Sequence, residues 1–535
     1  MPARLTGGGG RRPLAAIVAS AVIALILVLG PATPHGYGEA RAAGPGVARI
    51  AASEPSTLDP AAAGDTTAAF VIPQLFESLT AFDMDLVLRP ALARSWEVTD
   101  DGTTITFVLR DGLTFSDGSP LTAADVVESW LRLIDPDAPS PLSSLMEDVK
   151  GAAAYRRGEI GRDGVGIRVI DGRVVVTMER PGSDFPAIVS GATFAVVPPA
   201  VRAEGASVIV PDGFVGSGGY TLTAIVPDQI VLRANERYWA GKPAIDTVDL
   251  VTENGSHVPV PEFEGGAVDY AGLYSGDAAW IGYDATLGPM MRSIPNPTTT
   301  YVGFDTSRPP FDDVLVRRAF GAAVDWRRIA ATGGGSGTTR ATSMVPPGIP
   351  GRSERDFLPP YDPSAARDLL ARAGFPAGMG FPSIRFVTLG LGLDAAIIAE
   401  VRQVLGIDID YETMEFGDYS ERLDTDPPAM WSMSWHADYP GPNDFLGILL
   451  RTGSSNNPGL WSSGEFDSAI DDALATTDPT AQRSAFDRAE AIVQRDVPVV
   501  PVIYGEDWAV ARDGLLGAID NGMGGLRLAG LAWQR

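Results

Sequence analysis

The sequence predicts an α/β protein with large, ordered cores. Short apolar runs rich in β-branched residues alternate along the chain with longer segments of helical periodicity. Hydrophobic residues make up 45% of the 535-residue chain, and charged residues make up only 20%. This length and composition are typical of two or three globular domains and argue against disorder.

Two runs show the strand pattern most clearly. Residues 105–109, Ile-Thr-Phe-Val-Leu, predict a strand closed by the Asp-Gly pair at 111–112. Residues 174–178, Val-Val-Val-Thr-Met, predict a second strand directly after the Asp-Gly pair at 171–172. Asp-Gly pairs favour tight turns between strands because glycine adopts a positive φ without strain.

Three helices are predicted from the residues at their N-termini. The first spans 122–133, with Thr122 as N-cap and Asp125 three residues later in a variant of the capping box. The second spans 362–373 and ends at a glycine, and the third begins at 478 and runs to about 495. Each of these two opens with an Asp-Pro pair, which places an N-cap before a proline in the first helical position.

The chain carries a formal charge of −26, from 67 Asp and Glu residues against 41 Lys and Arg residues. Such a charge repels phosphate backbones and anionic membrane surfaces, and it attracts cationic or zwitterionic partners. We therefore expect no nucleic-acid partner.

The N-terminus has the layout of an export signal. Arginines precede an apolar run at 14–29, and no acidic residue occurs before Glu39. We expect residues 1–42 to be a signal peptide or a retained N-terminal anchor. The chain has no cysteine, which excludes disulfides and lipidation of a cysteine after the signal. The expected location is the periplasm or the outer face of the cytoplasmic membrane, and we do not expect a lipoprotein.

Residue types exclude most catalytic and cofactor sites. The histidines are His35, His257 and His436, and the first lies in the expected signal, so a His-rich zinc or nickel site is excluded. Proline follows the Gly-Lys pair at 241–242, which excludes a P-loop, and the glycine-rich run at 333–337 lacks the second glycine of a nucleophile elbow. We expect a loop there, and no cofactor, metal or enzymatic activity, although carboxylate-pair chemistry stays open.

The segment 431–440, Trp-Ser-Met-Ser-Trp-His-Ala-Asp-Tyr-Pro, places one carboxylate among large aromatics. Burying an ionised aspartate without a partner costs several kcal/mol. Asp438 is therefore either a structural residue of the turn before Pro440 or a group kept for a positively charged ligand.

Seven segments of the chain resemble those of a known protein family, and they follow one another along the chain in the same order as in that family. The longest is Phe-Ser-Asp-Gly-Ser-Pro-Leu-Thr-Ala-Ala-Asp-Val-Val-Glu-Ser-Trp at 115–130. The others lie at 54–60, 88–96, 216–220, 310–319, 361–376 and 499–504. Together they cover most of the chain from about residue 50, and they resemble family 5 of the extracellular solute-binding proteins, the oligopeptide- and dipeptide-binding proteins of ABC importers.

The resemblance implies a bilobal α/β receptor of the class II periplasmic-binding-protein type, with mixed sheets flanked by helices and an additional inserted domain. Its lobes would close on a solute by a hinge motion. The implied bounds are residues 46–81, 198–300 and 506–535 for a discontinuous lobe I, 82–197 for the extra domain and 301–505 for lobe II. The implied partners are ABC permease subunits in the membrane, with the receptor itself a monomer.

The resemblance also implies a ligand site. In peptide-binding relatives the aspartate of a Trp-x-x-Asp pattern pairs with the α-ammonium group of the peptide, and this pattern is Trp435 to Asp438 here. Trp435 would form an aromatic wall beside it, with Tyr439 next in the chain. Phe416 and Phe70 fall where relatives present aromatics to the cleft, although either is also compatible with an ordinary core position.

Three departures leave the solute open. Met433 and Ser434 offer no Arg or His for a ligand carboxylate, Gly441 stands where an acidic residue is common, and Ala68 and Ala69 leave room near the cleft. We predict delivery of di- or oligopeptides to an ABC importer. The alternatives are an oligosaccharide, nickel chelate, opine or haem on the same fold, a receptor that signals without transport, or a secreted hydrolase.

Overall fold

The computed structural model describes residues 46–252, 258–333, 338–390, 392–523 and 526–534. The expected signal or anchor, His257 and most of the glycine-rich loop after residue 333 lie outside this part of the chain. Within the described ranges, none of the helices has the length and apolar character needed to cross a bilayer.

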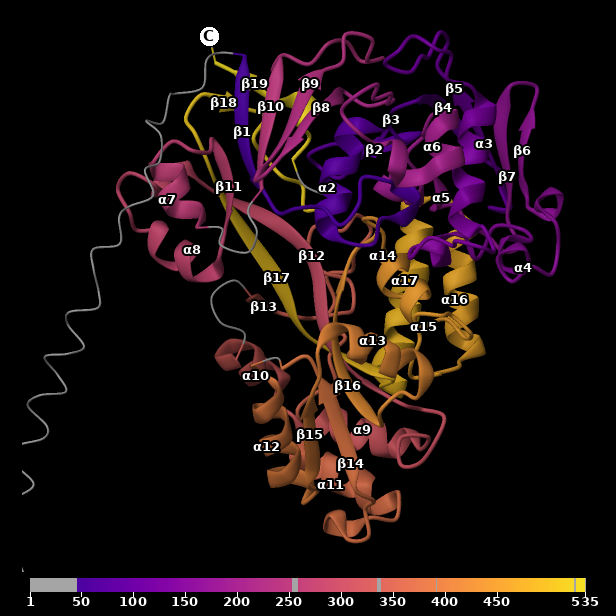
Figure 1. Ribbon diagram of the computed structural model, residues 1–535. Coiled ribbons are helices and arrows are strands. Elements are labelled where there is room, and N and C mark those ends of the chain that lie inside the picture. Colours follow the sequence, from indigo (N-terminus) through magenta and orange to yellow (C-terminus); the bar gives the residue numbers. More distant parts are fainter. Residues whose placement is uncertain (1–45, 253–257, 334–337, 391, 524–525, 535) are drawn as a thin grey trace, which may run out of the picture.

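One mixed sheet of eleven strands runs through the molecule (Figure 1). Its strand order is β15-β14-β16-β12-β17-β11-β1-β10-β9-β8, and β13 pairs with β17 beside this path. The upper strands are β1 (Val47–Ala52), β8 (Tyr220–Val226), β9 (Gln229–Ala234), β10 (Thr247–Thr252) and β11 (Tyr270–Leu273). The lower strands are β13 (Thr338–Arg340), β14 (Ile384–Thr388), β15 (Ile409–Thr413) and β16 (Met430–His436).

Two long strands, β12 (Met291–Phe304) and β17 (Val499–Ala511), connect the upper and lower parts of this sheet. They pair antiparallel along their length, but the register shifts between Pro295 and Thr299 and again between Thr300 and Tyr301. Such bulges interrupt ladder hydrogen bonds and bend the sheet locally. The ladder is therefore interrupted at the crossing between the lobes, where a bend costs fewer hydrogen bonds than in a regular ladder.

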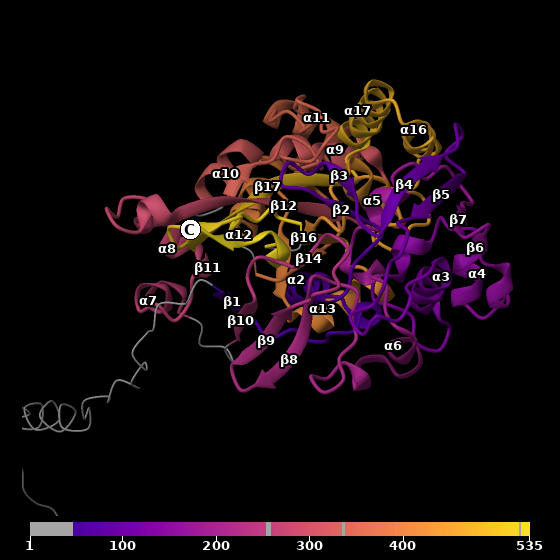
Figure 2. The same cartoon turned by 90° about the horizontal axis from the view of Figure 1, so that it is seen from above.

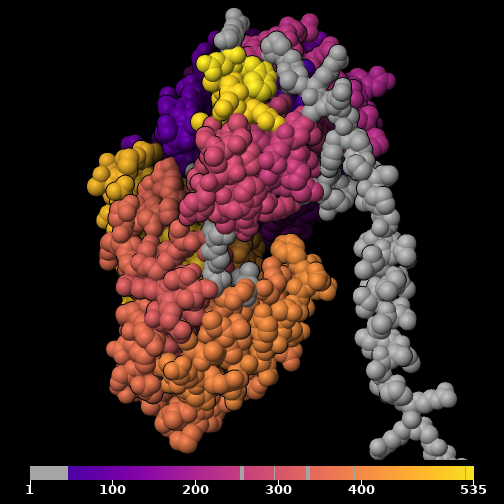
Figure 3. All heavy atoms as spheres, turned by 90° about the vertical axis from the view of Figure 1, so that its left-hand side faces the viewer, coloured from indigo at the N-terminus to yellow at the C-terminus, as the bar shows by residue number. Residues whose placement is uncertain are grey.

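Helices cover both ends of the sheet (Figure 1). Around the upper part lie α2 (Thr66–Leu75), α6 (Pro199–Glu204), α7 (Pro259–Glu264) and α8 (Ser275–Ile281). Around the lower part lie α9 (Val314–Ala323), α10 (Trp326–Gly333), α11 (Pro363–Arg372), α12 (Asp394–Leu405), α13 (Phe416–Thr425), α14 (Pro442–Phe445), α15 (Gly447–Leu450), α16 (Gly464–Leu474) and α17 (Pro479–Asp496). From the side, the segment with α7 and α8 and the lower lobe are separate masses with a hollow between them (Figure 3).

A second, antiparallel sheet of four strands belongs to the domain predicted over residues 82–197, called the inserted domain below. Its order is β4 (Ala93–Val98), β5 (Thr104–Leu109), β7 (Arg173–Thr177) and β6 (Ile167–Ile170), and it packs with α3 (Ala123–Leu131), α4 (Ala152–Arg156) and α5 (Phe185–Ile188). Short pairs are formed by β2 (Thr80–Phe82) with β3 (Leu88–Pro90) and by β18 (Leu515–Leu516) with β19 (Ala532–Trp533). Seen from above, the inserted domain lies beside α16 and α17 (Figure 2).

The elements predicted from local signals are confirmed. Strands β5 and β7 lie within one residue of the predicted runs, and α3, α11 and α17 begin directly after the predicted N-caps. The capping box is present, because the Asp125 carboxylate accepts hydrogen bonds from the backbone N–H and the hydroxyl of Thr122, both at 2.8 Å. Arg202 also pairs with Asp125 at 2.9 Å. The cap thus joins α3 to α6 as well as opening the helix.

Trp130 is the centre of the core of the inserted domain. Its ring packs edge-on against Phe107, Phe185 and Phe194, each with a centroid distance of 5.9 Å. Its indole N–H donates to the carbonyl of Phe194 at 3.0 Å. This cluster fixes the start of α5, where Phe185 directly follows Asp184.

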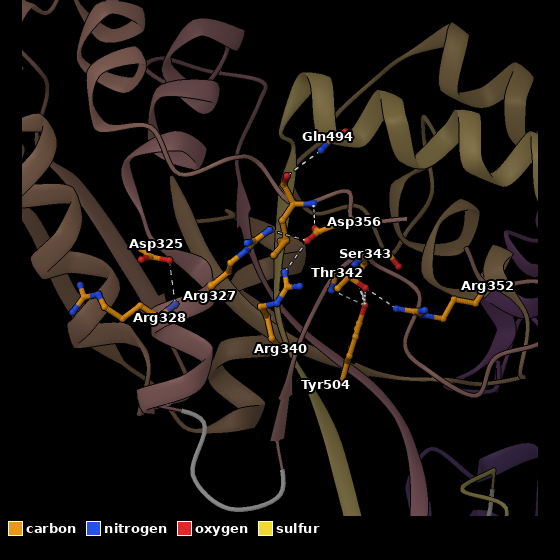
Figure 4. A network of polar contacts seen from close by, with 11 residues as sticks. Asp325, Arg327, Arg328, Arg340, Thr342, Ser343, Arg352, Asp356, Gln494 and Tyr504 are labelled. Carbon is orange, nitrogen blue, oxygen red and sulfur yellow. Dashed lines mark hydrogen bonds and ion pairs between the residues drawn. The ribbon is translucent and has the colours of Figure 1, made fainter. Parts of the chain in front are cut away.

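A polar network holds the long connection after β13 against neighbouring strands and helices of the lower part (Figure 4). The Tyr504 hydroxyl on β17 accepts from the N–H groups of Thr342 and Ser343 at 3.0 and 2.9 Å. Arg352 donates to the Thr342 hydroxyl at 2.6 Å, and Asp356 pairs with Arg340 at 2.9 Å. These contacts fix the connection to β13 and β17, and further contacts join it to α10 through Arg327 and to α17 through Gln494.

Glu490 on α17 lies under this connection and accepts from the Met344 N–H at 3.3 Å. Burial raises its pKa from 4.5 to about 8. The folded state therefore holds the proton more tightly than the unfolded state, so this residue lowers stability progressively as the pH rises from 4.5 to 8.

Replacing the carboxyl by an amide removes this penalty. We expect Glu490→Gln to raise the free energy of unfolding at pH 7 by up to about 3 kcal/mol and to leave it nearly unchanged at pH 4.5. Urea unfolding at both pH values measures the difference. Glu354→Gln on the same connection is the control, because the Glu354 side chain is 94% exposed. Equal effects of the two substitutions would contradict the prediction.

Candidate functional site

Three carboxyl groups meet where the lower lobe contacts the inserted domain. Asp438 follows β16, Asp444 lies in α14, and Asp184 precedes α5. Their negative charges act on one another, since the charges of Asp438 and Asp184 both raise the pKa of Asp444.

Asp444 is completely buried, with 0% of its surface exposed. One carboxylate oxygen, Oδ2, accepts from the indole N–H of Trp435 at 2.9 Å and from the backbone N–H of Asp438 at 3.2 Å. The other oxygen, Oδ1, has no hydrogen-bond partner in the described part of the chain. Asp444 therefore binds two of the predicted site residues, Trp435 and Asp438, through Oδ2, and its Oδ1 stays an unused acceptor.

Asp184 joins the inserted domain to the lower lobe. It accepts from the hydroxyl of Tyr439 and, at 2.9 Å, from the side-chain amide of Asn443. That amide also donates to the Tyr439 hydroxyl oxygen at 3.0 Å. Nearby, the N–H of Ser183 donates to the carbonyl of Leu474 at 3.1 Å. Asp184 and its neighbours thus dock the inserted domain against α14 and α16.

Burial dominates the electrostatics of the cluster. It raises the pKa of Asp438 to about 6, and it raises the pKa values of Asp184 and Asp444 as well. Among the described residues, no arginine or lysine is one of the main influences on the pKa of any of the three. A cluster of this kind is short of one positive charge.

Asp438 also lies where all three parts of the molecule approach one another. Its carbonyl oxygen is 4.0 Å from the position that a Cβ on Gly191 would occupy. The carbonyl of Gly191 in turn accepts from the hydroxyl of Ser78, in the segment predicted for lobe I, at 3.1 Å. The backbone at Asp438 therefore lies beside Gly191, which in turn is bonded to Ser78.

The structure brings together three of the five predicted site residues. Trp435 and Asp438 are partly buried and share Asp444, whereas Tyr439 is 1% exposed and packs into the core of the inserted domain. Phe416 is the first residue of α13, and it is 71% exposed, so it is not a core residue. Phe70, on α2, packs partly buried against the core of the upper part. Contact of these five residues with a solute stays a prediction.

Other residues near the predicted site differ from their expected roles. Ala68 is fully buried in the core of the upper part, so it leaves no space for a solute. The structure does not support Asp438 as the cap of a turn. In the described ranges its side chain accepts no hydrogen bond from a neighbouring N–H, and its own backbone N–H donates to Asp444. The described residues contain no group of three or more His, Asp or Glu side chains that could hold a metal ion.

Sequence reasoning missed Asp184, Asn443 and Asp444. Asp444 had a weak signal, since it is a second carboxylate six residues after Asp438 in an otherwise apolar segment. Asp184 had none, because its bond to Tyr439 spans 255 residues of sequence.

The profile of the bacterial extracellular solute-binding proteins, family 5 (middle), matches residues 87–457. The chain belongs to this family. Among its relatives, the probable deoxycholate-binding periplasmic protein YgiS of Escherichia coli is 31% identical, with 84% of this chain and 86% of YgiS aligned. The periplasmic oligopeptide-binding protein OppA of Salmonella typhimurium is 29% identical, with the same shares aligned.

Solved structures of the family share the fold. The Escherichia coli murein tripeptide binding protein MppA superposes with a TM-score of 0.75 at 23% identity, covering 92% of this chain and 99% of MppA. OppA of Burkholderia pseudomallei superposes with a TM-score of 0.74 at 26% identity, covering 92% and 100%. This family 5 protein therefore has the bilobal α/β binding-protein fold with an inserted domain. It is an extracytoplasmic solute-binding protein, and its relatives are named as binding proteins.

The Tyr439–Asp184 contact gives a testable contribution to stability. We expect Tyr439→Phe to lower the free energy of unfolding by about 1–3 kcal/mol, because it leaves a buried carboxylate with one donor fewer. Urea unfolding followed by fluorescence measures the loss. Tyr283→Phe is the control, since Tyr283 is 93% exposed. A loss no larger than that of the control would show that the contact does not hold the inserted domain.

Proposed function

We propose that this family 5 protein captures a solute with a free ammonium group, in the first place a di- or oligopeptide, and delivers it to an ABC permease by closure of its lobes. The observation that carries the proposal is Asp438, a partly buried carboxyl in a cluster without a cation. The peptide-binding names of OppA and MppA among its relatives support the same solute class.

The chemistry of an ammonium group fits what the cluster lacks. It supplies one positive charge and three N–H donors, and a charge-assisted hydrogen bond to a desolvated carboxylate contributes about 1.5–3 kcal/mol. An N-acetyl group offers neither the charge nor these donors. Asp438 would therefore distinguish a free N-terminus from a blocked one.

The cluster also argues against an anionic solute at this position. A bile acid such as deoxycholate, for which the relative YgiS is named, carries a carboxylate of its own. Placed beside Asp438 and Asp444, that carboxylate would meet charge of its own sign in a partly desolvated site. Deoxycholate is therefore the most informative competitor of a peptide.

Closure would use the architecture of the crossing strands. A solute bound at Asp438 would contact the lower lobe, whose backbone at Asp438 lies beside Gly191, so contacts to both sides of the cleft would favour the closed arrangement. The bulged part of β12 and β17 is where a hinge needs least distortion. The proposed bounds of the lobes and the inserted domain remain those given by the resemblance.

The setting of the receptor is part of the proposal. We propose a monomer that meets permease subunits at the outer face of the membrane, either released after export or held by its N-terminal apolar segment. The absence of cysteine means that no lipid is attached through a cysteine.

Calorimetry on the exported chain tests the solute class. Di- to hexapeptides are expected to bind, and their N-acetylated forms are expected to bind about 10- to 150-fold more weakly, the equivalent of one charge-assisted bond. Asp438→Asn is expected to weaken the free peptides by the same factor and to abolish the difference between free and acetylated forms.

Asp111→Asn is the matched control, because the Asp111 side chain is 95% exposed. Deoxycholate is titrated in parallel, and mass spectrometry of the recovered peptide tests for hydrolysis. Equal affinity for free and acetylated peptides would overturn the role of Asp438. Tight binding of deoxycholate alone would overturn the peptide assignment, and recovery of cleaved peptide would show an enzyme.

A further inference from the structure

The proposed function gives no role to the buried carboxyl group of Asp444. It is fully buried, it cannot touch a solute, and its Oδ1 lacks a partner among the described residues. A structural helix cap would need only one acceptor, and that acceptor is already used by Trp435 and the Asp438 backbone. The second oxygen and the charge of this carboxyl need another explanation.

The surroundings of Asp444 determine how many charges the cluster can hold. On its own lobe it faces Asp438, and across the contact it faces Asp184. Behind Asp184, Asp148 adds a further negative charge, and the buried Tyr439 hydroxyl stays neutral because its pKa is raised well above 10. His436 is exposed at the surface and bonds with the Thr298 hydroxyl. No described arginine or lysine faces the pair.

Two adjacent carboxyls without a cation, one fully buried and one partly buried, do not both ionise readily near neutral pH, so the pair retains a proton. A proton on Oδ1 of Asp444 leaves Oδ2 free to accept from the Trp435 indole and the Asp438 N–H. The hydrogen bonds to Oδ2 are therefore the same in both states, and Oδ1 has no partner among the described residues in either. Only the charge of the pair differs between the two.

We propose that Asp444 is a positioning and specificity-determining residue of the ammonium site: it orients Trp435 and Asp438, and the Asp438–Asp444 pair holds one proton when empty and releases it when an ammonium group binds. This inference rests on the proposed function. The step is balanced as a proton exchange: the ammonium ion enters with one positive charge, the carboxyl proton leaves to solvent, and the net charge of the site is unchanged.

The exchange gives selectivity that a single aspartate lacks. The empty site avoids a second buried negative charge, while a bound ammonium ion contacts the ionised Asp438 and is attracted by the ionised Asp444 behind it. A neutral group displaces no proton and gains nothing from Asp444. Affinity for ammonium solutes is then linked to pH: it rises with pH while the empty pair is protonated and levels off above the pKa values of the empty pair.

The first measurement uses the full exported chain without ligand. Infrared spectroscopy at pH 7 is expected to show a protonated carboxyl C=O band that disappears in Asp444→Asn. Glu490→Gln is the control, because Glu490 is a separate buried acid with a pKa of about 8 and should remove a different band. Identical carboxyl bands in the wild type and Asp444→Asn would overturn the proposal.

The second measurement counts protons on binding. Trialanine is titrated at pH 7 in two buffers of different ionisation enthalpy, and the wild type is expected to release a substantial fraction of one proton per peptide. Asp444→Asn keeps an amide oxygen for Trp435 and the Asp438 N–H, so it should bind trialanine with almost no proton release. Trp435→Phe removes an orienting donor but keeps both carboxyls, so it should bind more weakly and still release the proton.

The results of these measurements distinguish a failure of the proton exchange at Asp444 from a failure of the proposed peptide-binding function. Proton release that is unchanged in Asp444→Asn would reduce Asp444 to a structural residue and overturn the inference. If trialanine does not bind but the infrared band is present, the peptide assignment fails, and methylammonium chloride then replaces trialanine as the probe. A band lost with methylammonium and retained with sodium chloride supports the inference, and a band that survives both overturns it.

Discussion

The desolvation of negative charge is the constraint on which the functional part of this molecule depends. Asp438, Asp444 and Asp184 are brought together where the lower lobe meets the inserted domain, and no described arginine or lysine compensates them. Two of these carboxyls, Asp444 and Asp184, accept hydrogen bonds from neutral donors only. The donors are a tyrosine hydroxyl, an asparagine amide, an indole N–H and a backbone N–H. These donors orient the carboxyls and reduce the cost of burial without supplying a charge. In the proposed function, the ammonium group of a solute supplies the positive charge that these carboxyls lack.

The rest of the architecture can be understood as the support for this cluster. Strand β16 and the short helix α14 present two of the carboxyls from one lobe, and the core around Trp130 holds the third at the start of α5. The two long strands β12 and β17 carry the lower lobe on a crossing whose ladder is interrupted by bulges. Rigid packing therefore fixes the geometry within each part, while the connection between the parts is the least constrained. A receptor that must close and reopen needs both properties.

The same cluster explains how members of one family can differ in their solutes on a common fold. Relatives of this chain are named for oligopeptides and, in the case of YgiS, for deoxycholate, although they align over most of their length. Fold similarity alone does not select among such solutes, because the fold positions a cleft without fixing its charge. In this chain the sign of the charge at the junction favours a cation. In the proposed proton exchange, Asp444 would change the charge of the site without touching the solute.

Interactions between residues close in sequence were sufficient to predict many of the helices and strands of this protein. The N-caps at Thr122, Asp362 and Asp478 and the Asp-Gly turns act within a few residues, so the sequence predicted these elements closely. The pattern from Trp435 to Asp438 pointed to a candidate site. The sequence by itself thus determined the elements, the family and one carboxylate of interest. Only the tertiary structure decided what surrounds that carboxylate. Asp184 reaches Tyr439 across 255 residues, and Asp444 becomes significant only once burial removes water from both of its oxygens. Such effects depend on which distant surfaces meet, and no local pattern of residues encodes that meeting.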